Sequence, residues 1–314
     1  MTRRGTIINI HGCDGSFWPM GPDDDGDVFI PEDQVKGLFD APVRTDWDSQ
    51  AQQDGGTFHR EVNEWRDLSF GFHVKGHRHR PFDDVYSEFR NAFDYKPDRW
   101  DHDARLACIE VISQRSGARR LDVQLHEAPD FDPGVDPASI DYGNPILPLR
   151  AGQPYWYEPD VVTSWETTDA SGSGTIVVSN PTDVPMRQKW ILTRGTWTLP
   201  DVSWAGPRGA RAPGVDKLTG RDDSTRKILM PPLGAVEGGA VVDLDLTRNL
   251  MVRDAHDTNL LARMPVPGRY FTWLIPPWTP ETELPVSVTG APAGGARCQL
   301  VQPRRWRKPI GGEQ

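Results

Sequence analysis

Three histidines follow Phe72 closely and form the densest group of possible metal ligands in the chain. Zinc requires three or four such ligands in a tetrahedral arrangement. Here the histidines alternate with the cations Lys75 and Arg78, whose positive charge opposes a bound metal ion. We therefore interpret the cluster as the solvated end of a strand and expect no metal there. The three residues are His73, His77 and His79.

The acidic loop that ends at Glu32 resembles a calcium-binding loop in the order of its side chains. Asp23, Asp25 and Glu32 fall at ligand positions, and Gly26 falls at the position of the sharp turn. However, Gly21 occupies the first ligand position, and no helical pattern flanks the loop on either side, as an EF-hand requires. We expect a solvent-facing turn without calcium.

Covalent and acid–base catalysis find little support in the residue pattern. The chain has no Gly-x-Ser-x-Gly elbow, and none of its three cysteines lies in an activating context. Glu158 and Glu166 are one candidate pair for a glycoside hydrolase, which uses two carboxyl groups at a set separation. Acidic residues are so abundant here that this pair means little without geometry. We expect no enzymatic activity and no cofactor.

Tryptophan is concentrated after residue 150, in a part of the chain with short-strand patterning. Exposed indole rings on a β-sandwich can serve as stacking platforms for sugars, which makes four of these residues candidate contacts for carbohydrate or a partner. The alternative is that they fill the core and subunit contacts, where tryptophan is also enriched. We favour the alternative. The concentrated residues are Trp156, Trp165, Trp190, Trp197 and Trp204, and the four candidates are these without Trp190.

Short strands must position these residues in the first half of the chain. Residues 6–10 predict a first strand, and 68–72 alternate between large apolar and small residues, the period of a half-buried strand. Residues 106–112 and 121–125 predict a hairpin. We expect a long polar loop over 41–57, because it is rich in Gly, Asp and Gln.

One segment has the period of an amphipathic helix. Its apolar residues fall at i, i+3, i+4, i+7 and i+11, on a single face. Pro81 precedes it, Asp83 or Asp84 is expected to cap it, and Pro97 prevents its continuation. The apolar residues are Phe82, Val85, Tyr86, Phe89 and Phe93.

The second half of the chain is predicted to consist almost entirely of strands and turns. Periodicity is lost over 128–142, which we interpret as a connection between domains. Short strands at the spacing seen beyond it are typical of a β-sandwich or jelly roll. The predicted strands are 175–179 and 188–193, joined by an Asn-Pro turn, then 242–246, 269–275 and 284–288.

The composition supports a β protein of two domains. The chain has 314 residues, with 30 Gly and 29 Pro, and 37% of its residues are hydrophobic. Gly and Pro interrupt regular elements, so we do not expect a helix bundle or a large doubly wound α/β fold. The apolar residues suffice for a core, so the chain is expected to fold. No segment has the pattern of a signal peptide or a membrane span.

The net charge bears on the kind of partner, and the cysteines bear on the compartment in which the chain is made. The formal net charge is −10, from 35 Lys and Arg against 45 Asp and Glu, which disfavours nucleic-acid binding. Three widely spaced cysteines without a CxxC motif are typical of a reducing cytosol. The end of the chain is basic, and we interpret it as a solvated tail or as an arm that docks on an acidic partner. Its cations are Arg304, Arg305, Arg307 and Lys308.

Five stretches, taken in order, carry a resemblance to a known family. Each is weakly specific alone, but together they span nearly the whole chain. They are Asn9-Ile-His-Gly12, Phe39–Val43 with Gln50–Gly56, Arg66–Gly76, Gly174–Asp183 with Gln188–Leu192, and Arg305–Gly311. In this order they resemble the distal tail protein (Dit) family of long, non-contractile-tailed bacteriophages, often called minor tail proteins in actinobacterial phages.

The resemblance implies a structural virion protein at the tail tip, made in the host cytoplasm. Residues 1–142 would be a β-sandwich or split barrel with one packed helix, forming a hexameric ring that continues the tail tube. Residues 143–300 would be a galectin-like β-sandwich, followed by the basic tail 301–314. The protein would act as a hub joining the tail tube protein, the tape measure protein and baseplate or receptor-binding proteins. DNA would pass through the ring.

Elementary physics supports parts of this expectation. A β domain without large helices must cover its strand edges, which ring assembly does. An acidic lumen would let DNA slide without sticking, and we expect Asp23, Asp24 and Asp25 to contribute to it. The alternative functions are a carbohydrate-binding module that aids host adsorption and a glycoside hydrolase.

Overall fold

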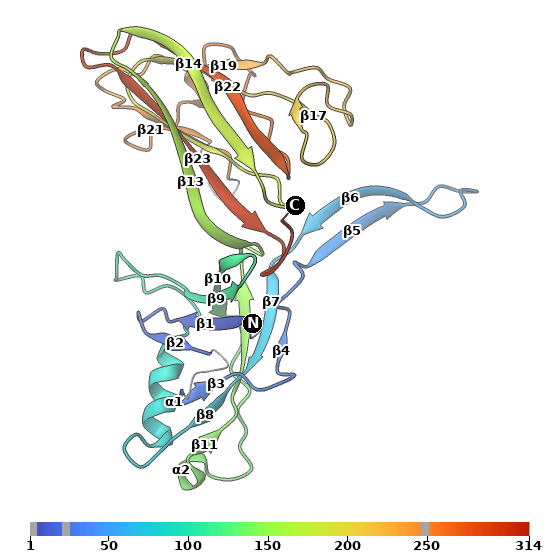
Figure 1. Ribbon diagram of the computed structural model, residues 1–314, viewed down its shortest axis with the longest axis vertical. Helices are drawn as coiled ribbons and strands as arrows, with labels where there is room; N and C mark the ends of the chain where they lie inside the picture. Colours follow the sequence, from blue (N-terminus) through green and yellow to red (C-terminus); the bar gives the residue numbers. More distant parts are fainter. Residues whose placement is uncertain (1–4, 21–25, 246–250, 314) are drawn as a thin grey trace. The chain divides into compact units, whose positions relative to one another are not determined.

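The computed structural model describes residues 5–20, 26–245 and 251–313 and has two compact units (Figure 1). The first comprises 1–157 and 306–312, and the second comprises 158–305 with the last two residues. The chain thus enters the second unit within β13 (Trp156–Thr167) and leaves it at the end of β23 (Ala296–Trp306). The prediction of a mainly β protein is confirmed. No helix in the described part of the chain is long and apolar enough to span a membrane.

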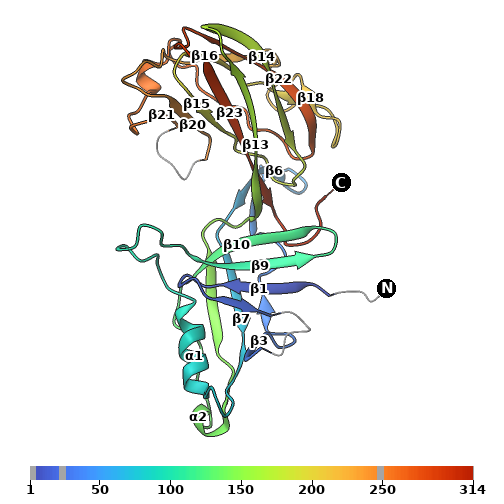
Figure 2. The same cartoon turned by 60° about the vertical axis from the view of Figure 1, so that its left-hand side comes forward.

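The first unit is built on one antiparallel sheet, of which β10, β9 and β1 lie side by side in Figure 2. The predicted first strand and the predicted hairpin are confirmed as β1 and as β9 with β10. Alternate residues of β10, such as Leu121 and Val123, are fully buried, which explains the period of two. The strand order is β2 (Phe17–Pro19), β1 (Ile7–His11), β9 (Ala107–Ser113), β10 (Gly117–Leu125), β12 (Ile146–Ala151), β7 (Arg66–Gly71) and β4 (Val35–Lys36).

A smaller three-stranded sheet completes the first unit. The segment 128–142, expected to connect the domains, lies inside this unit instead, because Tyr142 pairs with Lys75 in this sheet. The functional boundaries at 142/143 and 300/301 remain predictions. The order is β11 (Tyr142–Gly143), β8 (His73–Lys75) and β3 (Val28–Phe29), with the short α2 (Pro137–Ile140) immediately before β11.

The predicted helix is confirmed as α1 (Phe82–Asn91), with Phe82, Val85 and Phe89 buried. The ring of Phe89 packs against Phe72, with centroids 4.8 Å apart. The predicted cap is wrong. Pro81 occupies the N-cap position and supplies no side-chain hydrogen bond, whereas the distant Asp141 accepts one from the backbone N–H of Phe82 at 3.4 Å. Asp83 and Asp84 lie inside the first turn, where they favour the helix only through its dipole.

The long polar loop predicted over 41–57 is wrong for residues 43–48 and 57, which are in strands. The chain forms a hairpin of β5 (Val43–Asp48) and β6 (Thr57–Asn63), so that only 49–56 is irregular. These strands pair only with each other among the described residues. Both faces of the hairpin are largely exposed. Without a buried face the sequence has no alternation of apolar and polar residues, which is the signal on which the strand prediction depends.

The second unit is a β-sandwich, as predicted. Its two antiparallel sheets enclose one apolar core, in which Trp190 of one sheet and Trp197 of the other are almost fully buried. The first sheet runs β13, β23, β15 (Lys189–Leu192), β20 (Ala240–Asp243) and β21 (Val252–Asp254). The second runs β14 (Ser171–Asn180), β22 (Thr279–Thr289), β16 (Thr196–Pro200) and β19 (Lys227–Leu229). The shorter elements are β17 (Trp204–Ala205), β18 (Ala212–Pro213) and the 3₁₀ turn η1 (Leu261–Arg263).

The Asn-Pro turn at residue 180 crosses the sandwich instead of closing a hairpin. The strands β14 and β15 on either side of it belong to opposite sheets. Asn180 is fully buried, and its side-chain amide donates to the carbonyls of Val184 (2.9 Å), Ile275 (3.1 Å) and Pro276 (3.0 Å). The turn residue therefore ties the crossover to a distant segment of the chain.

The strand predicted over 269–275 does not form. The backbone N–H groups of Thr272 and Trp273, which would pair with a neighbouring strand, donate to the carboxylate of Asp201 instead. Asp201 is only 2% exposed. Of the predicted strand 242–246, the part to Asp243 is β20, and Leu246 lies outside the described residues.

The basic end of the chain is held by the fold and is not a free tail. Arg304 lies in β23 and donates to the carbonyl of Ser179. Arg307 pairs with Glu61 at 2.6 Å. Lys308 pairs with Asp40 at 3.1 Å.

Two buried arginines fasten the returning segment 306–312 within the first unit. Arg66 donates to the carbonyl of Arg307 (2.8 Å) and to carbonyls of three other residues, and burial lowers its pKa to about 10. Arg119 donates to the carbonyls of Lys308 (3.0 Å) and Gly311 (2.7 Å). Backbone carbonyls thus accept hydrogen bonds from both guanidinium groups and hold the end of the chain in place.

Candidate assembly surface and binding cleft

The histidine cluster is part of the small sheet and its following turn. The ring of His73 lies between those of Phe29 and Tyr142, and burial together with the charge of Lys75 lowers its pKa. His77 accepts a hydrogen bond from the backbone N–H of His79. The described residues contain no group of three or more His, Cys, Asp or Glu side chains that could hold a metal ion.

The acidic residues proposed for the lumen cannot be placed. Asp23, Asp24 and Asp25 lie outside the described residues, as does Gly21 of the calcium-like pattern. Directly after them, Asp27 forms an ion pair with Arg80 at 2.6 Å.

The two glutamates considered for hydrolysis do not form a catalytic pair. Glu158 and Glu166 lie on the same strand, β13, eight residues apart. At about 3.3 Å per residue this places them roughly 26 Å apart, whereas glycoside hydrolases hold their carboxyl groups about 5–9.5 Å apart. None of the three cysteines is an activated nucleophile: burial raises the pKa of Cys108 and Cys298 to about 12, and burial together with the charge of Asp14 raises the pKa of Cys13.

The candidate tryptophans pack inside the protein. Trp156 is fully buried in the core of the first unit. Trp197 and Trp204 belong to the core of the second, and Trp165 packs edge-on against Trp197 with centroids 6.0 Å apart. Core filling, the interpretation favoured from the sequence, matches this burial. The three buried rings leave no exposed face on which a sugar could stack.

The exposed aromatic side chains are on other parts of the chain, which the sequence reasoning did not single out. Trp47 and Phe58, on the β5–β6 hairpin, are 60% and 50% exposed, and Trp100, on the loop after α1, is 80% exposed. A tryptophan flanked on both sides by Asp, as Trp47 is, was the available signal, since charged neighbours do not suit a core position.

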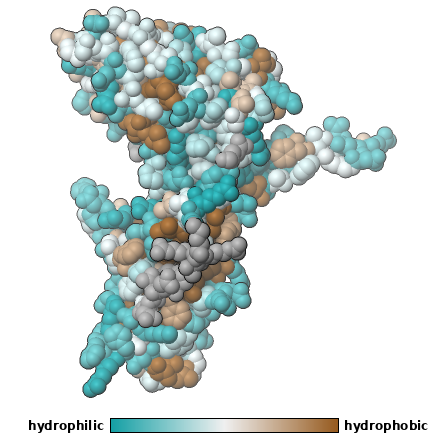
Figure 3. Space-filling model, viewed as in Figure 1, coloured by the Kyte–Doolittle hydropathy of each residue, from teal (hydrophilic) through white to brown (hydrophobic). Residues whose placement is uncertain are grey.

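We call the exposed apolar side chains Val43, Trp47 and Phe58 the hairpin surface. The rings of Trp47 and Phe58 meet edge-on with centroids 5.5 Å apart, across the paired strands. Figure 3 shows apolar surface along the hairpin and hydrophilic surface at its tip. Arg60 pairs with Asp46 at 2.6 Å and lowers the pKa of that carboxyl group by its hydrogen bond. Aromatic rings among charges are typical of a protein-binding surface.

A polar row crosses the outer face of the main sheet in the first unit. Asn9, Glu110, Arg120 and Tyr157 are successive neighbours across four strands. Glu110, only 7% exposed, accepts hydrogen bonds from Asn9 (3.1 Å) and Arg120 (2.9 Å). Burial raises the pKa of Glu110, but the hydrogen bonds outweigh it and the net pKa is lowered. The row therefore holds a carboxylate, not a proton donor, at neutral pH.

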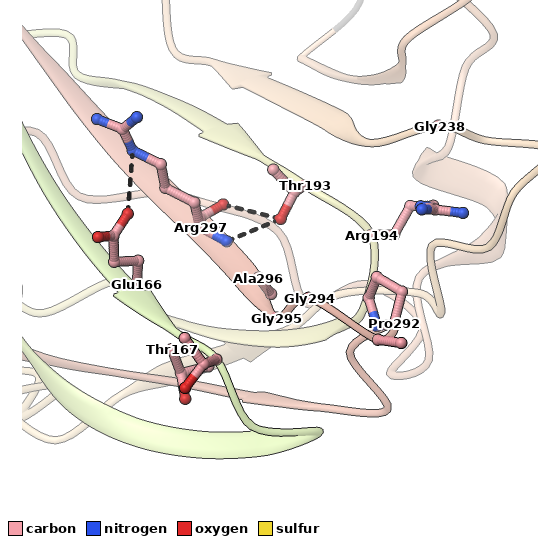
Figure 4. Close-up of a pocket in the computed structure, with 12 residues that line it drawn as sticks. Glu166, Thr167, Thr193, Arg194, Gly238, Pro292, Gly294, Gly295, Ala296 and Arg297 are labelled. Atoms are coloured by element: carbon pink, nitrogen blue, oxygen red, sulfur yellow. Dashed lines mark hydrogen bonds and ion pairs between the residues drawn. The ribbon is translucent and has the colours of Figure 1, made fainter.

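The second unit contains an open cleft of about 930 Å³ (Figure 4). Glu166 at the end of β13 lies 4.0 Å from Arg297 of β23. The backbone N–H of Arg297 donates to the Thr193 hydroxyl at 2.8 Å, which joins β23 to the end of β15. In Figure 4 the guanidinium groups of Arg194 and Arg297 point to opposite sides.

A glycine turn forms one wall of this cleft. Gly294 and Gly295 have φ angles of +99° and +87°, and a Cβ at Gly295 would overlap the carbonyl oxygen of Thr167. None of the described residues that line the cleft is aromatic. The cleft can form hydrogen bonds and ion pairs, but its lining lacks both a stacking ring and a pair of carboxyl groups.

The architecture of two β units joined by long strands defines the class of fold. It matches the crystal structure of the Dit protein of phage SPP1, described as a paradigm of the hub adsorption apparatus in phages that infect Gram-positive bacteria. The match covers 95% of this chain and 99% of that one, with a TM-score of 0.52 and 13% sequence identity. At that identity the likeness shows the fold alone.

Sequence similarity leads to particular relatives. The chain is 25% identical to minor tail protein Gp27 of Mycobacterium phage D29 over 342 residues, which covers 96% of this chain and 97% of that protein. It is 24% identical to minor tail protein Gp27 of Mycobacterium phage L5 over 338 residues, covering 95% and 96%. No family model matches the chain. The predicted resemblance to Dit-like minor tail proteins is thus confirmed in sequence and in fold.

Proposed function

We propose that this protein is a non-enzymatic structural component of a phage tail tip, located in the virion. The observation that carries the proposal is the similarity to two phage minor tail proteins over nearly the full length of both partners. Because the alignment includes both units, it supports a role for the whole chain and not for one module. The fold shared with the SPP1 hub protein supports the same role.

The finer proposal is a hexameric ring that joins the tail tube protein, the tape measure protein and the baseplate or receptor-binding proteins. The hairpin surface supports self-assembly. A two-stranded ribbon is at best marginally stable in water when nothing covers it. Trp47 and Phe58 would be removed from water by contact with the next copy, at a gain of about 1.5–3 kcal/mol for each large apolar side chain fully buried.

DNA passage through the ring is proposed on electrostatic grounds. The net charge of −10 disfavours adhesion of a phosphate backbone to the protein. Asp23, Asp24 and Asp25 remain the residues that we propose for the lumen. Host-cell cytoplasm is the proposed site of synthesis.

A carbohydrate-binding module was the alternative derived from the sequence. It depended on the exposure of the tryptophans after residue 150, and three of the four candidates are buried. The role in the tail is therefore preferred.

Immunogold electron microscopy of intact virions tests the location, and we expect labelling confined to the tail tip. Labelling of the head or along the whole tail shaft would refute the proposal. Negative-stain imaging of the purified protein, alone and mixed with the tail tube protein, tests the ring. We expect rings from the wild type and from the control Trp100→Ser, and few or none from the double variant Trp47→Ser/Phe58→Ser. Equal ring formation by all three proteins would show that the hairpin surface takes no part in ring assembly.

A further inference from the structure

A small hairpin in the second unit presents two arginines that have no acidic partner. β17 and β18 pair through Trp204 with Pro213 and Ala205 with Ala212, and residues 206–211 connect them. Arg208 is exposed and Arg211 is half-buried. Within the part of the chain that the structure describes, neither guanidinium has a hydrogen-bond or ion-pair partner.

Two other arginines of the same unit are neutralised by carboxylates. Arg226 lies 2.8 Å from the carboxylate of Asp201. Arg221, in the segment just beyond β18, lies 2.8 Å from the carboxylate of Asp223. The β17–β18 connection thus carries two positive charges with no carboxylate partner among the described residues, in a protein whose net charge is −10.

The position of Arg208 is fixed by an aromatic ring. Its guanidinium lies over the ring of Trp278, 4.0 Å from the centroid. The backbone N–H of Gly209 donates to the carbonyl of Trp278 at 3.0 Å, which joins the hairpin tip to the residue before β22. A guanidinium stacked in this way loses little entropy when it binds a ligand.

The backbone at this contact is strained. Trp278 has a φ angle of +53°, a conformation that a bulky side chain rarely adopts. Gly206, with a φ angle of +105°, is not strained because it has no Cβ, but a Cβ there would collide with the carbonyl oxygen of Ala210. Strained backbone persists only where the surrounding structure over-determines it, and such places cluster at binding sites.

The two cations also repel each other. Burial, and then the charge of Arg208, lowers the pKa of Arg211. No carboxylate within 4 Å offsets this repulsion among the described residues. An anion bound between the guanidinium groups would relieve it.

We propose that Arg208, held against Trp278, and Arg211 on the same hairpin form a binding site for a phosphate group. A single guanidinium fork already occupies both oxygens of a carboxylate. A tetrahedral phosphate has further oxygens for the second fork, so two neighbouring arginines match it better. The ligand is either a free phosphorylated molecule, such as a glycerol phosphate, or a phospholipid headgroup. The site does not depend on the ring proposed above.

Calorimetric titration of the full-length protein with inorganic phosphate and with glycerol 1-phosphate tests the site directly. Flotation with vesicles of phosphatidylglycerol, compared with phosphatidylcholine alone, separates the lipid source from the free ligand. We expect binding that weakens as salt is raised, and a loss of at least tenfold in affinity in Arg208→Gln/Arg211→Gln. The control Arg269→Gln removes an exposed arginine of the same unit and should bind as the wild type does.

A second measurement separates binding from misfolding. In the absence of phosphate the double variant should unfold at about the same temperature as the wild type, because relief of the repulsion offsets the loss of the stack of Arg208 on Trp278. Phosphate should raise the unfolding temperature of the wild type and of Arg269→Gln, but not that of the double variant. Equal affinity of the double variant and the wild type, or binding of neither phosphate, glycerol phosphate nor anionic vesicles, would overturn the proposal. Binding of double-stranded DNA alone would also overturn it.

Discussion

Replacing Arg119 by methionine should detach the C-terminal segment from the first unit. Arg119 is fully buried, donates to the carbonyls of Lys308 and Gly311, and stacks on Trp306 at 3.7 Å from the ring centroid. Methionine has a similar length and fills part of the same space, but it donates no hydrogen bond. The change therefore tests the hydrogen bonds and the stacking more than the packing.

The magnitude follows from three contributions. Two hydrogen bonds from a charged donor contribute about 3–6 kcal/mol together, and the cation–π contact adds about 1 kcal/mol. Methionine recovers part of the cost of burying a cation, about 2–3 kcal/mol. The expected net loss is about 2–4 kcal/mol, because the carbonyls of Lys308 and Gly311 are left without a donor. With a urea m-value of about 2 kcal/mol per molar, the unfolding midpoint should fall by roughly 1–2 M.

Urea unfolding followed by tryptophan fluorescence measures this loss, and limited trypsin digestion with mass spectrometry locates it. Cleavage after Arg307 should be faster in Arg119→Met than in the wild type. The matched control is Arg115→Met, an exposed arginine in the same β9–β10 hairpin with no hydrogen-bond or ion-pair partner among the described residues. If Arg119→Met and Arg115→Met unfold at the same midpoint and are cut equally fast, Arg119 does not hold the segment.

Three further predictions follow from other residues. In the native protein at pH 8, a thiol reagent should modify Cys13 first. The pKa of about 12 at Cys108 and Cys298 leaves only a fraction of about 10⁻⁴ of each as thiolate, the reactive form. Rapid modification of all three thiols in the native state would contradict this. Folding lowers the pKa of Glu110 below its ordinary value of 4.5. The stabilisation that the Glu110 carboxylate gives the folded state is therefore complete above pH 4.5 and is lost as the pH falls further. The difference in unfolding free energy between the wild type and Glu110→Gln should therefore shrink from pH 6 to pH 3, and a constant difference would show that the carboxylate is not stabilised. Gly295→Ala should lower the free energy of unfolding by about 2 kcal/mol or more, because φ at Gly295 is positive and the new Cβ would overlap a carbonyl oxygen. Thermal unfolding measures this loss, and an unchanged melting temperature would show that alanine causes no strain there.

Local patterns were sufficient where one face of an element is buried. The stripe of Phe82, Val85 and Phe89 identified α1, since a helix presents residues three and four apart on one side. The same reasoning found the β9–β10 hairpin, where buried residues alternate with exposed ones. It failed for β5, because both faces of the β5–β6 hairpin are open to water and no period develops there.

Pairing between distant segments could not be predicted in the same way. The turn residue Asn180 serves a crossover between sheets because its amide binds the carbonyls of Ile275 and Pro276, nearly a hundred positions along the chain. The unpaired arginines Arg208 and Arg211 look ordinary in a sequence where carboxylates are plentiful. Only the folded chain shows that the carboxylates are used by other cations.

The sequence by itself determined the mainly β class, the helix face, the sandwich of the second unit and the resemblance to phage tail proteins. These properties depend on composition, on periods of a few residues and on the order of motifs, all of which can be read locally. Tertiary structure alone decided which tryptophans are buried, that the basic end of the chain is fastened by Arg66 and Arg119, and that the β5–β6 hairpin exposes its aromatic rings. Burial and charge neutralisation depend on which distant segments meet, and a linear pattern does not contain that information.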